Sequence, residues 1–356
     1  MRKSLAATGS SEFVFLSLKG NKFSRSKNYH NGLLNMGHKS TWVEIDPHNK
    51  FSQLLDCKKR YIEKNTTFIV ASPSHILALY ARLVLLQKIY LDAGWPLSDG
   101  VVLSRREYGF MGFRALLIYL LDFFAFHFSS MIFLESSAQV RSVRTKFLIP
   151  RKKLVVLETG FDGNRVKNRN STPVVVKRFT TLLFRGGAQQ EAGLTVLTEA
   201  IDLLKERKDI RFIVASKGFK VDTKGLTKVT IYDEYLSDQE LWKLYGQADV
   251  MLGQLSQHSR LKRTLPHKFF EAGYFKKCYL TSNVGAISEF VEKGLVFGFS
   301  GGSSQSLVEA INDLVDKKNL RTALGRNLGE FYIENFSQKT LTIKLVNNIV
   351  RKSCGD

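Results

Sequence analysis

The sequence has few cysteines and no hydrophobic leader. Its three cysteines, Cys57, Cys278 and Cys354, lack metal-ligand spacing and form no disulfide framework. Such cysteine usage fits a reducing compartment. The first twelve residues, MRKSLAATGSSE, lack the long apolar segment of a secretory signal peptide. We therefore expect a cytoplasmic protein with a flexible leader.

Two short signatures are also missing. No G-x-G-x-x-G is present, which argues against a dinucleotide-binding fold. No Asp-x-Asp pair of the kind that binds a metal ion is found either. The sequence therefore predicts neither a nicotinamide cofactor nor a bound metal.

No segment is long and apolar enough to predict a transmembrane helix. The longest apolar run, residues 110–133, approaches the length of a span, but Arg114, Asp122 and His127 interrupt it. We expect a buried helix here. Flanked by Arg105, Arg106 and Arg114, it would offer an apolar and basic face to a membrane surface.

Acidic residues are scarce. The chain has 32 Asp and Glu against 53 Lys and Arg, which gives a formal charge of +21 and a pI near 9.8. Such a charge favours polyanionic partners: nucleic acid, an anionic membrane face or phosphorylated small molecules. The 356 residues, 44% of them hydrophobic, are enough for one large or two medium domains.

Strand-like and helix-like segments alternate along the chain. The predicted strands are 13–18, 40–45, 67–72, 88–92, 131–136, 152–162, 179–184, 211–216, 228–236, 250–255, 278–281 and 295–299. The predicted helices between and after them include 25–36, 51–64, 75–86, 136–146, 194–207, 237–247, 304–316, 319–334 and 337–351. This alternation predicts parallel sheets covered on both faces, in two Rossmann-like halves. A polar stretch, 163–173, reads as the linker between them.

The most informative stretch is residues 265–290, LPHKFFEAGYFKKCYLTSNVGAISEF. Pro266 can open a helix, because the first helical turn does not need its missing N–H. That helix carries Lys268 and Glu271, and a buried strand then leads through a small-residue loop, 282–285, into another helix. A loop of this kind presents free N–H groups to an anion. A carboxylate, an ammonium and such a loop suit a ligand with ribose hydroxyls and phosphates.

This stretch resembles the C-terminal domain of glycosyltransferases of the two-Rossmann GT-B type, in the family-4-like group (glycosyl transferases group 1). The family pattern is Pro-x-Lys-x-x-Glu, a Gly, a strand, a Gly-containing loop and a Glu. Lys268, Glu271, Gly273, Gly285 and Glu289 fall on those positions. The segment SDQELWKLYGQADVML matches the helix and Ala-Asp-Val that precede the donor loop in the family. The resemblance extends over roughly residues 12–351.

The resemblance implies an α/β fold with two Rossmann-like domains facing each other across a cleft. Residues 1–163 would form the acceptor-side domain, 174–335 the nucleotide-sugar-binding domain, and 336–356 a terminal helix that crosses back to the first. The implied activity moves a sugar from a nucleotide-sugar to a glycan or lipid-linked acceptor, with retention and without a metal or other cofactor. The implied location is the inner face of a membrane, with an anionic membrane surface as a further partner.

Three departures from the family pattern affect the predicted chemistry. The family's diphosphate-binding Arg and Lys are replaced here by Gly187 and Ala192. The first Glu of the family's Glu-x7-Glu pair is replaced by Arg263, as in members with the Pro-x-Lys-x-x-Glu form. Arg260, Lys262 and Arg263 make the donor loop cationic, which suits phosphates.

The expected donor contacts combine the resemblance with residue chemistry. Glu271 would bind the ribose hydroxyls, while Lys268, Arg185 and the 282–285 amides would bind the diphosphate. Arg185, Lys217 or Lys268 could substitute for the missing cations. The full set of predicted donor-binding residues is Gly20, Arg185, Gly186, Lys217, Lys268, Glu271, Ser282, Val284 and Gly285.

Two residues of the first half are candidate catalytic groups. His75 and Asp92 follow predicted strands, and ligands of parallel sheets bind beyond the carboxyl ends of strands. Asp92 with Trp95 would also form a sugar contact, although an Asp helix cap and a core Trp explain the same residues. Gly20 and Asn21 would face the cleft or form a plain turn.

Three other functions remain open. A GT-B-like binding or scaffold subunit with impaired catalysis would explain the missing cations. A nucleic-acid-binding protein would explain the charge, although the basic residues are spread along the chain and no nucleic-acid motif is present. A phosphorylase or an epimerase could use the same fold.

Overall fold

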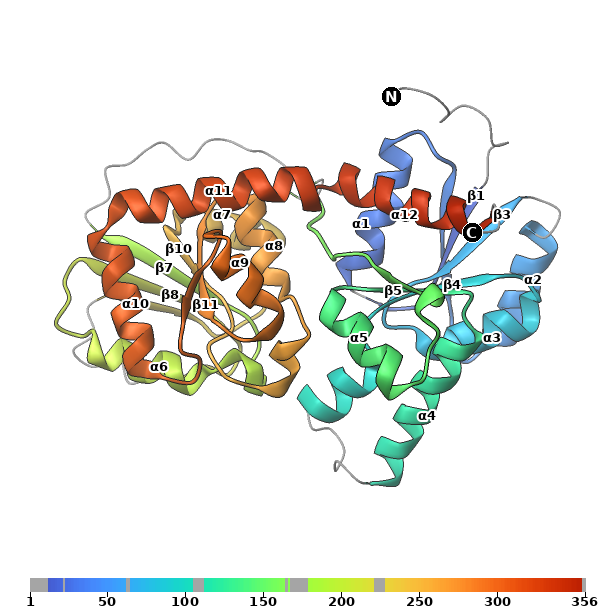
Figure 1. Cartoon of the computed structure of the whole chain (residues 1–356), viewed down its shortest axis with the longest axis horizontal. Coiled ribbons are helices and arrows are strands. Elements are labelled where there is room, and N and C mark those ends of the chain that lie inside the picture. Colours follow the sequence, from blue (N-terminus) through green and yellow to red (C-terminus); the bar gives the residue numbers. More distant parts are fainter. Residues whose placement is uncertain are drawn as a thin grey trace. The chain divides into compact units, whose positions relative to one another are not determined.

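The computed structural model describes residues 12–21, 23–61, 65–104, 112–163, 166, 179–220 and 228–353. Most of the expected leader and of the expected linker lies outside these residues, as do Arg105 and Arg106. The chain divides into two compact units (Figure 1). Unit 1 comprises Met1–Asp162 and Gln338–Asp356, and unit 2 comprises Gly163–Ser337.

Unit 1 is built on a parallel sheet with the strand order β2-β1-β3-β4-β5-β6. The strands are β1 (Glu12–Leu18), β2 (Ser40–Ile45), β3 (Thr66–Val70), β4 (Ile89–Gly94), β5 (Met131–Leu134) and β6 (Leu154–Val156). The helices are α1 (Ser24–Asn35), α2 (Lys50–Tyr61), α3 (His75–Leu85), α4 (Phe113–Phe128), α5 (Ser137–Lys146) and α12 (Gln338–Ser353).

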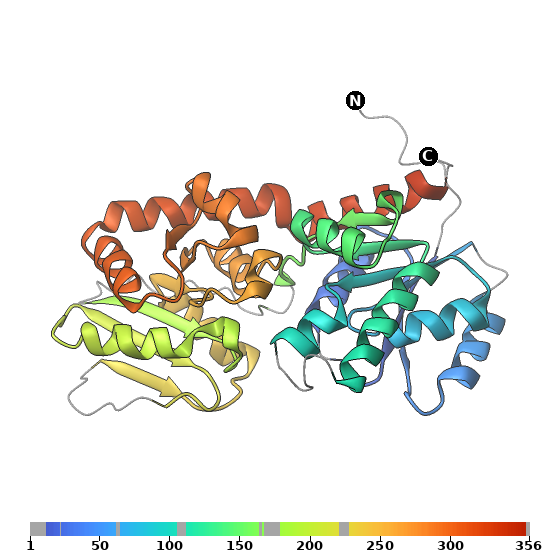
Figure 2. The same cartoon turned by 60° about the horizontal axis from the view of Figure 1, so that its bottom comes forward.

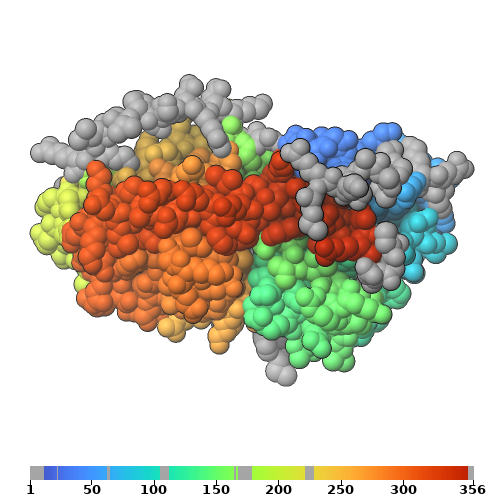
Figure 3. Space-filling view, turned by 45° about the horizontal axis from the view of Figure 1, so that its top comes forward, coloured from blue at the N-terminus to red at the C-terminus, as the bar shows by residue number. Residues whose placement is uncertain are grey.

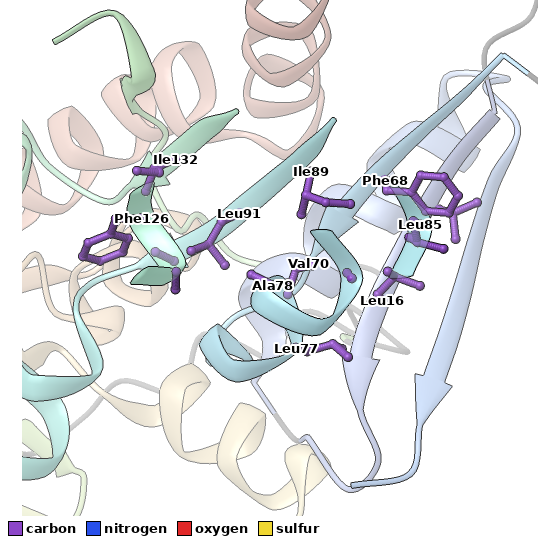
Figure 4. Packing of buried hydrophobic residues seen from close by; sticks show 14 of the residues in the cluster. Leu16, Phe68, Val70, Leu77, Ala78, Leu85, Ile89, Leu91, Phe126 and Ile132 are labelled. Atoms are coloured by element: carbon purple, nitrogen blue, oxygen red, sulfur yellow. The ribbon is translucent and has the colours of Figure 1, made fainter. Parts of the chain in front are cut away.

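Both faces of this sheet are buried, because successive strand side chains point to opposite sides. On β1, Val14 and Leu16 join the cluster formed with α2, α3, α4 and α5. Phe13 and Phe15 join the other cluster, formed with α1 and α12. Figure 4 shows the first cluster, where Phe126 of α4 and residues of α3 lie against the strands.

The last helix completes unit 1 from the far end of the sequence. Leu341, Leu345 and Ile349 of α12 are buried in the cluster that contains Phe13 and Phe15. The Thr342 hydroxyl lies so close to Gly32 of α1 that a Cβ there would be 2.0 Å from its oxygen. Figure 3 shows α12, at the red end of the colour scale, on the surface of unit 1. The predicted helix 337–351 is confirmed.

Unit 2 has a second parallel sheet, with the order β12-β11-β10-β7-β8-β9. Its strands are β7 (Thr180–Arg185), β8 (Ile210–Ala215), β9 (Val229–Tyr232), β10 (Val250–Leu252), β11 (Cys278–Ser282) and β12 (Phe297–Phe299). Its helices are α6 (Leu194–Leu203), α7 (Asp238–Gln247), α8 (His267–Tyr274), α9 (Ser288–Glu292), α10 (Ser304–Asp316) and α11 (Lys318–Phe336).

Helices cover both faces of this sheet as well (Figures 1 and 2). α6 and α10 bury Leu197 and Ile311 in the cluster that contains Leu182 and Phe184 of β7. α8 and α11 are joined by aromatic contacts, with the ring of Phe336 5.2 Å from that of Phe270. The predicted α/β fold with two Rossmann-like sheets is confirmed.

Three predicted strands are much shorter than expected: 228–236 forms a strand only at Val229–Tyr232, 250–255 only at Val250–Leu252, and 152–162 is shortened most. Residues 152–162 form a strand only at Leu154–Val156. The backbone beyond it is bonded by side chains of α1 instead: Arg25 donates to the Leu157 carbonyl at 2.7 Å, and Tyr29 donates to the Glu158 carbonyl at 2.5 Å. The described part of the apolar run, from residue 112, contains α4 and most of β5. In the described part of the chain, no helix combines the length and apolarity needed to cross a bilayer.

Candidate functional site

The strand order of unit 2 changes direction between the neighbouring strands β7 and β10. β7 lies between β8 and β10. The chain runs from β7 through α6 to β8 on one side, and from β10 through α8 to β11 on the other. Such a reversal of direction is the usual ligand position in an open parallel sheet.

Arg185, the last residue of β7, is held at this edge by Glu271 of α8. Its Nε lies 3.0 Å from Oε2 of Glu271 and 2.8 Å from the Tyr245 hydroxyl, and its terminal nitrogen donates to Oε1. The Tyr245 hydroxyl in turn donates to Oε2 at 2.6 Å. Nδ1 of His267 lies 2.8 Å from Oε1. Each carboxylate oxygen of Glu271 thus has two partners.

Electrostatic attraction within this cluster keeps Glu271 ionised beside the Arg185 cation. Burial alone would raise the pKa of Glu271, but the charges of Arg185 and His267 hold it well below its usual range. The Glu271 side chain is 2% exposed and that of Arg185 is 28% exposed. The guanidinium therefore keeps a solvent-facing surface while the carboxylate beneath it is covered. These hydrogen bonds let Glu271 position Arg185. A contact between Glu271 and ribose hydroxyls, as predicted, would require Arg185, Tyr245 or His267 to release the carboxylate.

Lys268 is a buried cation beside this pair. Its Nζ donates to the Gly253 carbonyl at 2.7 Å and lies 4.0 Å from the centre of the Phe184 ring. The residue is only 6% exposed. Burial, followed by the charge of Arg185, lowers the pKa of Lys268 to about 7. An anion bound at this edge of the sheet would favour the protonated, charged form of Lys268, which burial disfavours.

The backbone of Gly186 completes this part of the site. A Cβ on Gly186 would lie 3.7 Å from Nζ of Lys268. The structure therefore brings Arg185, Gly186, Lys268 and Glu271 together. Their role in donor binding stays a prediction.

Lys217 follows a neighbouring strand at the same edge of the sheet. It follows β8, which pairs with β7. Its ammonium lies 5.2 Å from the centre of the Tyr235 ring, and its side chain is exposed. Lys217 as a donor-binding residue stays a prediction.

The loop after β11 lies beyond β10 and is only partly available to an anion. The amides of Ser282 and Asn283 donate to the carbonyls of Gln254 and Phe299 at 2.8 and 2.9 Å, and that of Val284 donates to the Ser282 carbonyl at 3.0 Å. These three N–H groups are therefore already bonded within the chain. Gly285 has φ +66°, and its backbone packs against Lys262. Phosphate contacts from this loop stay a prediction.

The cationic loop before α8 is also partly committed. Arg260 donates to Oε1 of Glu191 at 2.7 Å, and both side chains are largely buried. This ion pair joins the loop after β10 to the loop after β7. Lys262 is exposed. Arg260 therefore holds the loops after β7 and β10 together. The phosphate contact that the sequence suggested for it stays a prediction.

The sequence analysis missed Tyr245, His267 and Gly253. Tyr245 and Gly253 lie far from α8 in the sequence, so no local pattern connects them to Glu271 or Lys268. His267 stands four residues before Glu271, a spacing that puts both on one helix face. That spacing is the one signal that could have found a member of this set.

In unit 1, Asp92 is a buried partner of α1. Nε of Arg25 donates to its Oδ1 at 2.7 Å, and the Ser26 hydroxyl donates to Oδ2 at 2.5 Å. Arg25 also bonds Thr159 at 3.0 Å, so the group ties β4 to the segment after β6. Arg25 and Asp92 are 2% and 0% exposed. The geometry favours a structural ion pair, and a catalytic role for Asp92 stays a prediction.

His75 is buried at the start of α3. Its Nε2 lies 3.8 Å from Oδ1 of Asp122, whose carboxylate also accepts from the amides of Leu97 and Ser98 at 2.9 Å. Burial lowers the pKa of His75 despite this neighbour. The Asp122 carboxylate thus anchors the loop after β4, and the buried His75 ring lies beside it. Its catalytic role also stays a prediction.

Two further predicted residues are placed near these groups. Gly20 has φ +81° in an exposed turn after β1, with Asn21 bonding the Ser72 carbonyl at 2.6 Å. Trp95 lies 5.7 Å from the Phe23 ring. The turn explains Gly20 without a ligand, and a donor contact from it stays a prediction.

Comparison with known proteins supports the predicted family. Residues 167–330 match the family described as Glycosyl transferases group 1. This range contains Arg185, Lys268 and Glu271. None of the curated proteins matches the chain.

Solved structures share the fold at low sequence identity. A glycosyltransferase from Rickettsia africae matches with a TM-score of 0.69 and 14% identity, over 95% of this chain and 98% of that one. HepE from Anabaena in complex with UDP matches with 0.68 and 13%, over 96% and 100%. Sucrose-phosphate synthase from Thermosynechococcus elongatus matches with 0.70 and 10%, over 97% and 100%. The predicted resemblance to GT-B glycosyltransferases is confirmed.

Proposed function

We propose that this chain, a glycosyltransferase of the group 1 type by its second unit and its fold, transfers a sugar from a nucleotide-sugar to a glycan or lipid-linked acceptor. The observation that carries the proposal is the cationic cluster at the carboxyl ends of β7 and β10. Arg185 and Lys268 stand there with Glu271 as their buried counter-ion. The cluster lies within the range that matches the family.

The cluster suits a diphosphate that leaves with extra negative charge. Arg185 offers a guanidinium that Glu271 already orients, so little reorganisation is needed when charge develops. Lys268 offers an ammonium beneath it, close to the Gly186 backbone. Because burial disfavours the Lys268 cation in the free protein, a phosphate is a stronger partner there than at the surface. The proposed leaving group is thus stabilised by side-chain cations, without a metal ion.

A uridine nucleotide is the first donor to test. HepE is described in complex with UDP and with UDP-glucose, and the chains share the fold over 96% of this one. The carboxyl edge of unit 2 holds the further predicted donor contacts Lys217 and Gly285. Glu271 acts in this proposal as the residue that positions Arg185.

The acceptor side of the proposal rests on unit 1. His75 and Asp92 remain its candidate catalytic residues, and retention of the anomeric configuration is the outcome that the family resemblance implies. A position at the cytoplasmic face of a membrane, on an anionic lipid surface, is part of the same proposal. The excess of basic residues supports both phosphate and membrane partners.

Donor binding can be followed through a tryptophan next to the site. Trp242 of α7 lies 5.6 Å from the Tyr245 ring, and Tyr245 bonds Glu271. We expect UDP and UDP-sugars to change its fluorescence and to raise the melting temperature, because a ligand that binds the folded state stabilises it. ADP-, GDP- and CMP-sugars are titrated in parallel. Loss of the fluorescence change in the Trp242→Phe variant would show that Trp242 reports the binding.

Substitutions at the cluster then locate the site. Arg185→Gln and Lys268→Met should each weaken nucleotide binding about tenfold or more, which is ~1.4 kcal/mol. Lys205→Met is the matched control, since this lysine of unit 2, in the turn after α6, has an exposed side chain. Unchanged affinity in both cluster variants would refute the proposed donor site.

A scaffold subunit is the second candidate function. Gly187 and Ala192 replace the family's phosphate-binding cations, and Arg260 is bonded to Glu191. Nucleotide-sugar binding without transfer to added glycan or lipid acceptors would identify a binding subunit. Transfer that is lost in Lys268→Met would instead establish the enzyme.

A further inference from the structure

The outer face of α4 is apolar where a surface helix is normally polar. Its exposed large side chains follow one another at intervals of one, three or four residues along the helix. They are Phe113, Leu116, Leu117, Leu120, Phe124 and Phe128. Phe113 is 74% exposed, whereas Asp122 points inward and is fully buried. The helix therefore turns its larger apolar stripe toward the surroundings.

The neighbouring helix α3 continues this surface. α3 packs against α4 on one side and α2 on the other, and Figures 1 and 2 show the three helices next to each other. The exposed positions of α3 are Ile76, Tyr80 and Leu83, and Leu83 is 66% exposed. We call the exposed apolar side chains of these two helices the α3–α4 face. Such a contiguous apolar surface marks an interaction site rather than a solvated face.

Basic side chains border the α3–α4 face. Nζ of Lys146 lies 4.3 Å from the centre of the Tyr119 ring on α4, and Nζ of Lys50 lies 5.0 Å from that of Tyr80 on α3. Nζ of Lys153 donates to the carbonyl of His127, near the end of α4, at 2.7 Å. The sequence of α3 contains no Asp or Glu, and the one acidic residue of α4, Asp122, is buried. Nζ of Lys146 also lies 3.8 Å from Oδ1 of the buried Asp99, so among these residues the net positive charge beside the face comes from Lys50 and Lys153.

Helix length decides how such a face can meet a bilayer. α4 has 16 residues, so it is about 24 Å long, against ~30 Å for a hydrocarbon core. It is too short to span, and its buried Asp122 and Phe126 pack within unit 1. A helix with one apolar face and basic neighbours is suited to lie in the interface between headgroups and acyl chains.

We infer that the α3–α4 face docks unit 1 on an anionic lipid bilayer, with α4 lying parallel to the membrane plane. The apolar side chains enter the interfacial region, while Lys146, Lys153 and Lys50 contact lipid phosphates. A second copy of this chain is a poorer occupant. Its own face carries the same basic border, and two chains of formal charge +21 repel each other. The inference rests on the membrane location proposed above and names the surface that would make the contact. It does not depend on the donor site, because no residue of unit 2 contributes to it.

Vesicle co-sedimentation of the full chain tests this inference. We expect binding to vesicles of phosphatidylcholine with phosphatidylglycerol, weaker binding to phosphatidylcholine alone, and a decrease at high salt, where surface charges are screened. The double variant Leu117→Glu/Phe124→Glu should lower the partition coefficient about tenfold or more. Leu83→Glu on α3 is a second, independent variant. All three positions are exposed, so the fold should tolerate the changes.

The matched control is Leu203→Glu, because Leu203 is 54% exposed on α6 of unit 2. It should bind vesicles as the wild type does. The inference fails if the wild type does not bind the anionic vesicles, or if the α4 and α3 variants bind as strongly as the control. It also fails if those variants only abolish self-association in analytical ultracentrifugation, which would identify a second copy as the occupant. Nucleotide binding, measured in parallel, should be the same in all these proteins.

Discussion

At the scale of single residues, unit 2 combines one buried cation, Lys268, with one partly exposed cation, Arg185, and one buried anion, Glu271. Glu271 satisfies Arg185, whereas among the described residues the Gly253 carbonyl, at 2.7 Å, is the one hydrogen-bond acceptor of the Lys268 ammonium. The pKa of Lys268, lowered to about 7 by burial and by Arg185, reflects this imbalance. Burial of the Lys268 cation lowers the stability of the free protein, and a bound anion would compensate for this cost. The site therefore favours ligand binding over stability.

Two substitutions should therefore change stability in opposite directions. Lys268→Met removes a poorly compensated buried cation and should raise the free energy of unfolding by roughly 1–4 kcal/mol at pH 7. Glu271→Gln leaves Arg185 without its counter-ion and should lower it by about 3 kcal/mol. Urea unfolding of both variants against wild type measures the difference. A loss of stability in both would show that the Lys268 ammonium is well compensated.

The effect of Lys268→Met also depends on pH. Between the folded pKa of about 7 and the unfolded pKa of ~10.4, the unfolded state holds more protons, so wild-type stability rises with pH. The cost of the buried ammonium is complete below pH 7 and is lost toward pH 10. The stabilisation by Lys268→Met should shrink over the same interval. A difference that does not change between pH 7 and 9.5 would contradict the lowered pKa.

At the scale of elements, the carboxyl edge of unit 2 is held by contacts between loops. The Arg260–Glu191 pair connects the loops after β10 and β7. The loop after β11 approaches the same region, because Gly285 packs directly on the backbone of Lys262. These contacts set the positions of the strand ends around the cationic cluster.

Gly285→Ala tests the closest of these contacts. A Cβ there would lie 2.2 Å from Cα of Lys262, in addition to the strain of φ +66°. Gly294→Ala is the matched control, because Gly294 has the same φ of +66° with nothing within 4 Å of an added Cβ. The control should lose about 1 kcal/mol of stability, and Gly285→Ala should lose more and bind nucleotide more weakly. Thermal and urea unfolding measure the stability of both variants. Equal losses in Gly285→Ala and Gly294→Ala would show that the loop relaxes freely around the added Cβ.

At the scale of the whole molecule, unit 1 is discontinuous in sequence. It contains the first 162 residues and the segment from Gln338 onward. Leu341, Leu345 and Ile349 of α12 fill the face of the sheet that α1 leaves incomplete. Unit 1 therefore requires the end of the chain to close its core.

Truncation after Ser337 should destabilise unit 1 and spare unit 2. Exposing three buried Leu and Ile side chains and their partners costs about 1.5–3 kcal/mol each, comparable to the whole stability of a domain. Limited proteolysis should cut unit 1 rapidly in the truncated chain. Nucleotide-dependent Trp242 fluorescence should persist, because its site lies within Gly163–Ser337. Loss of both properties would show that unit 2 also depends on α12.

The sequence by itself determined the fold class and most element positions. The strand 40–45 and the helix 304–316 were predicted with their observed bounds, because apolar periodicity is a local property that follows from strand and helix geometry. The pairing of Lys268 with Glu271 on one helix, next to a strand end, was also readable locally. The family match on residues 167–330 agrees with that reading.

Only the tertiary structure decided what each charged side chain does. The ion pair that fixes the Arg185 guanidinium joins residues 86 positions apart in the sequence, Arg185 and Glu271. Arg260 is likewise bonded to Glu191, 69 positions away. Asp92, expected near a substrate, is buried against Arg25 of α1. The apolar run of α4 was expected to form a buried helix with one apolar face open to the surroundings, and only the structure shows which of its side chains form that exposed face. Hydrogen bonds and burial depend on which distant segments the fold brings together, and no local pattern contains that information.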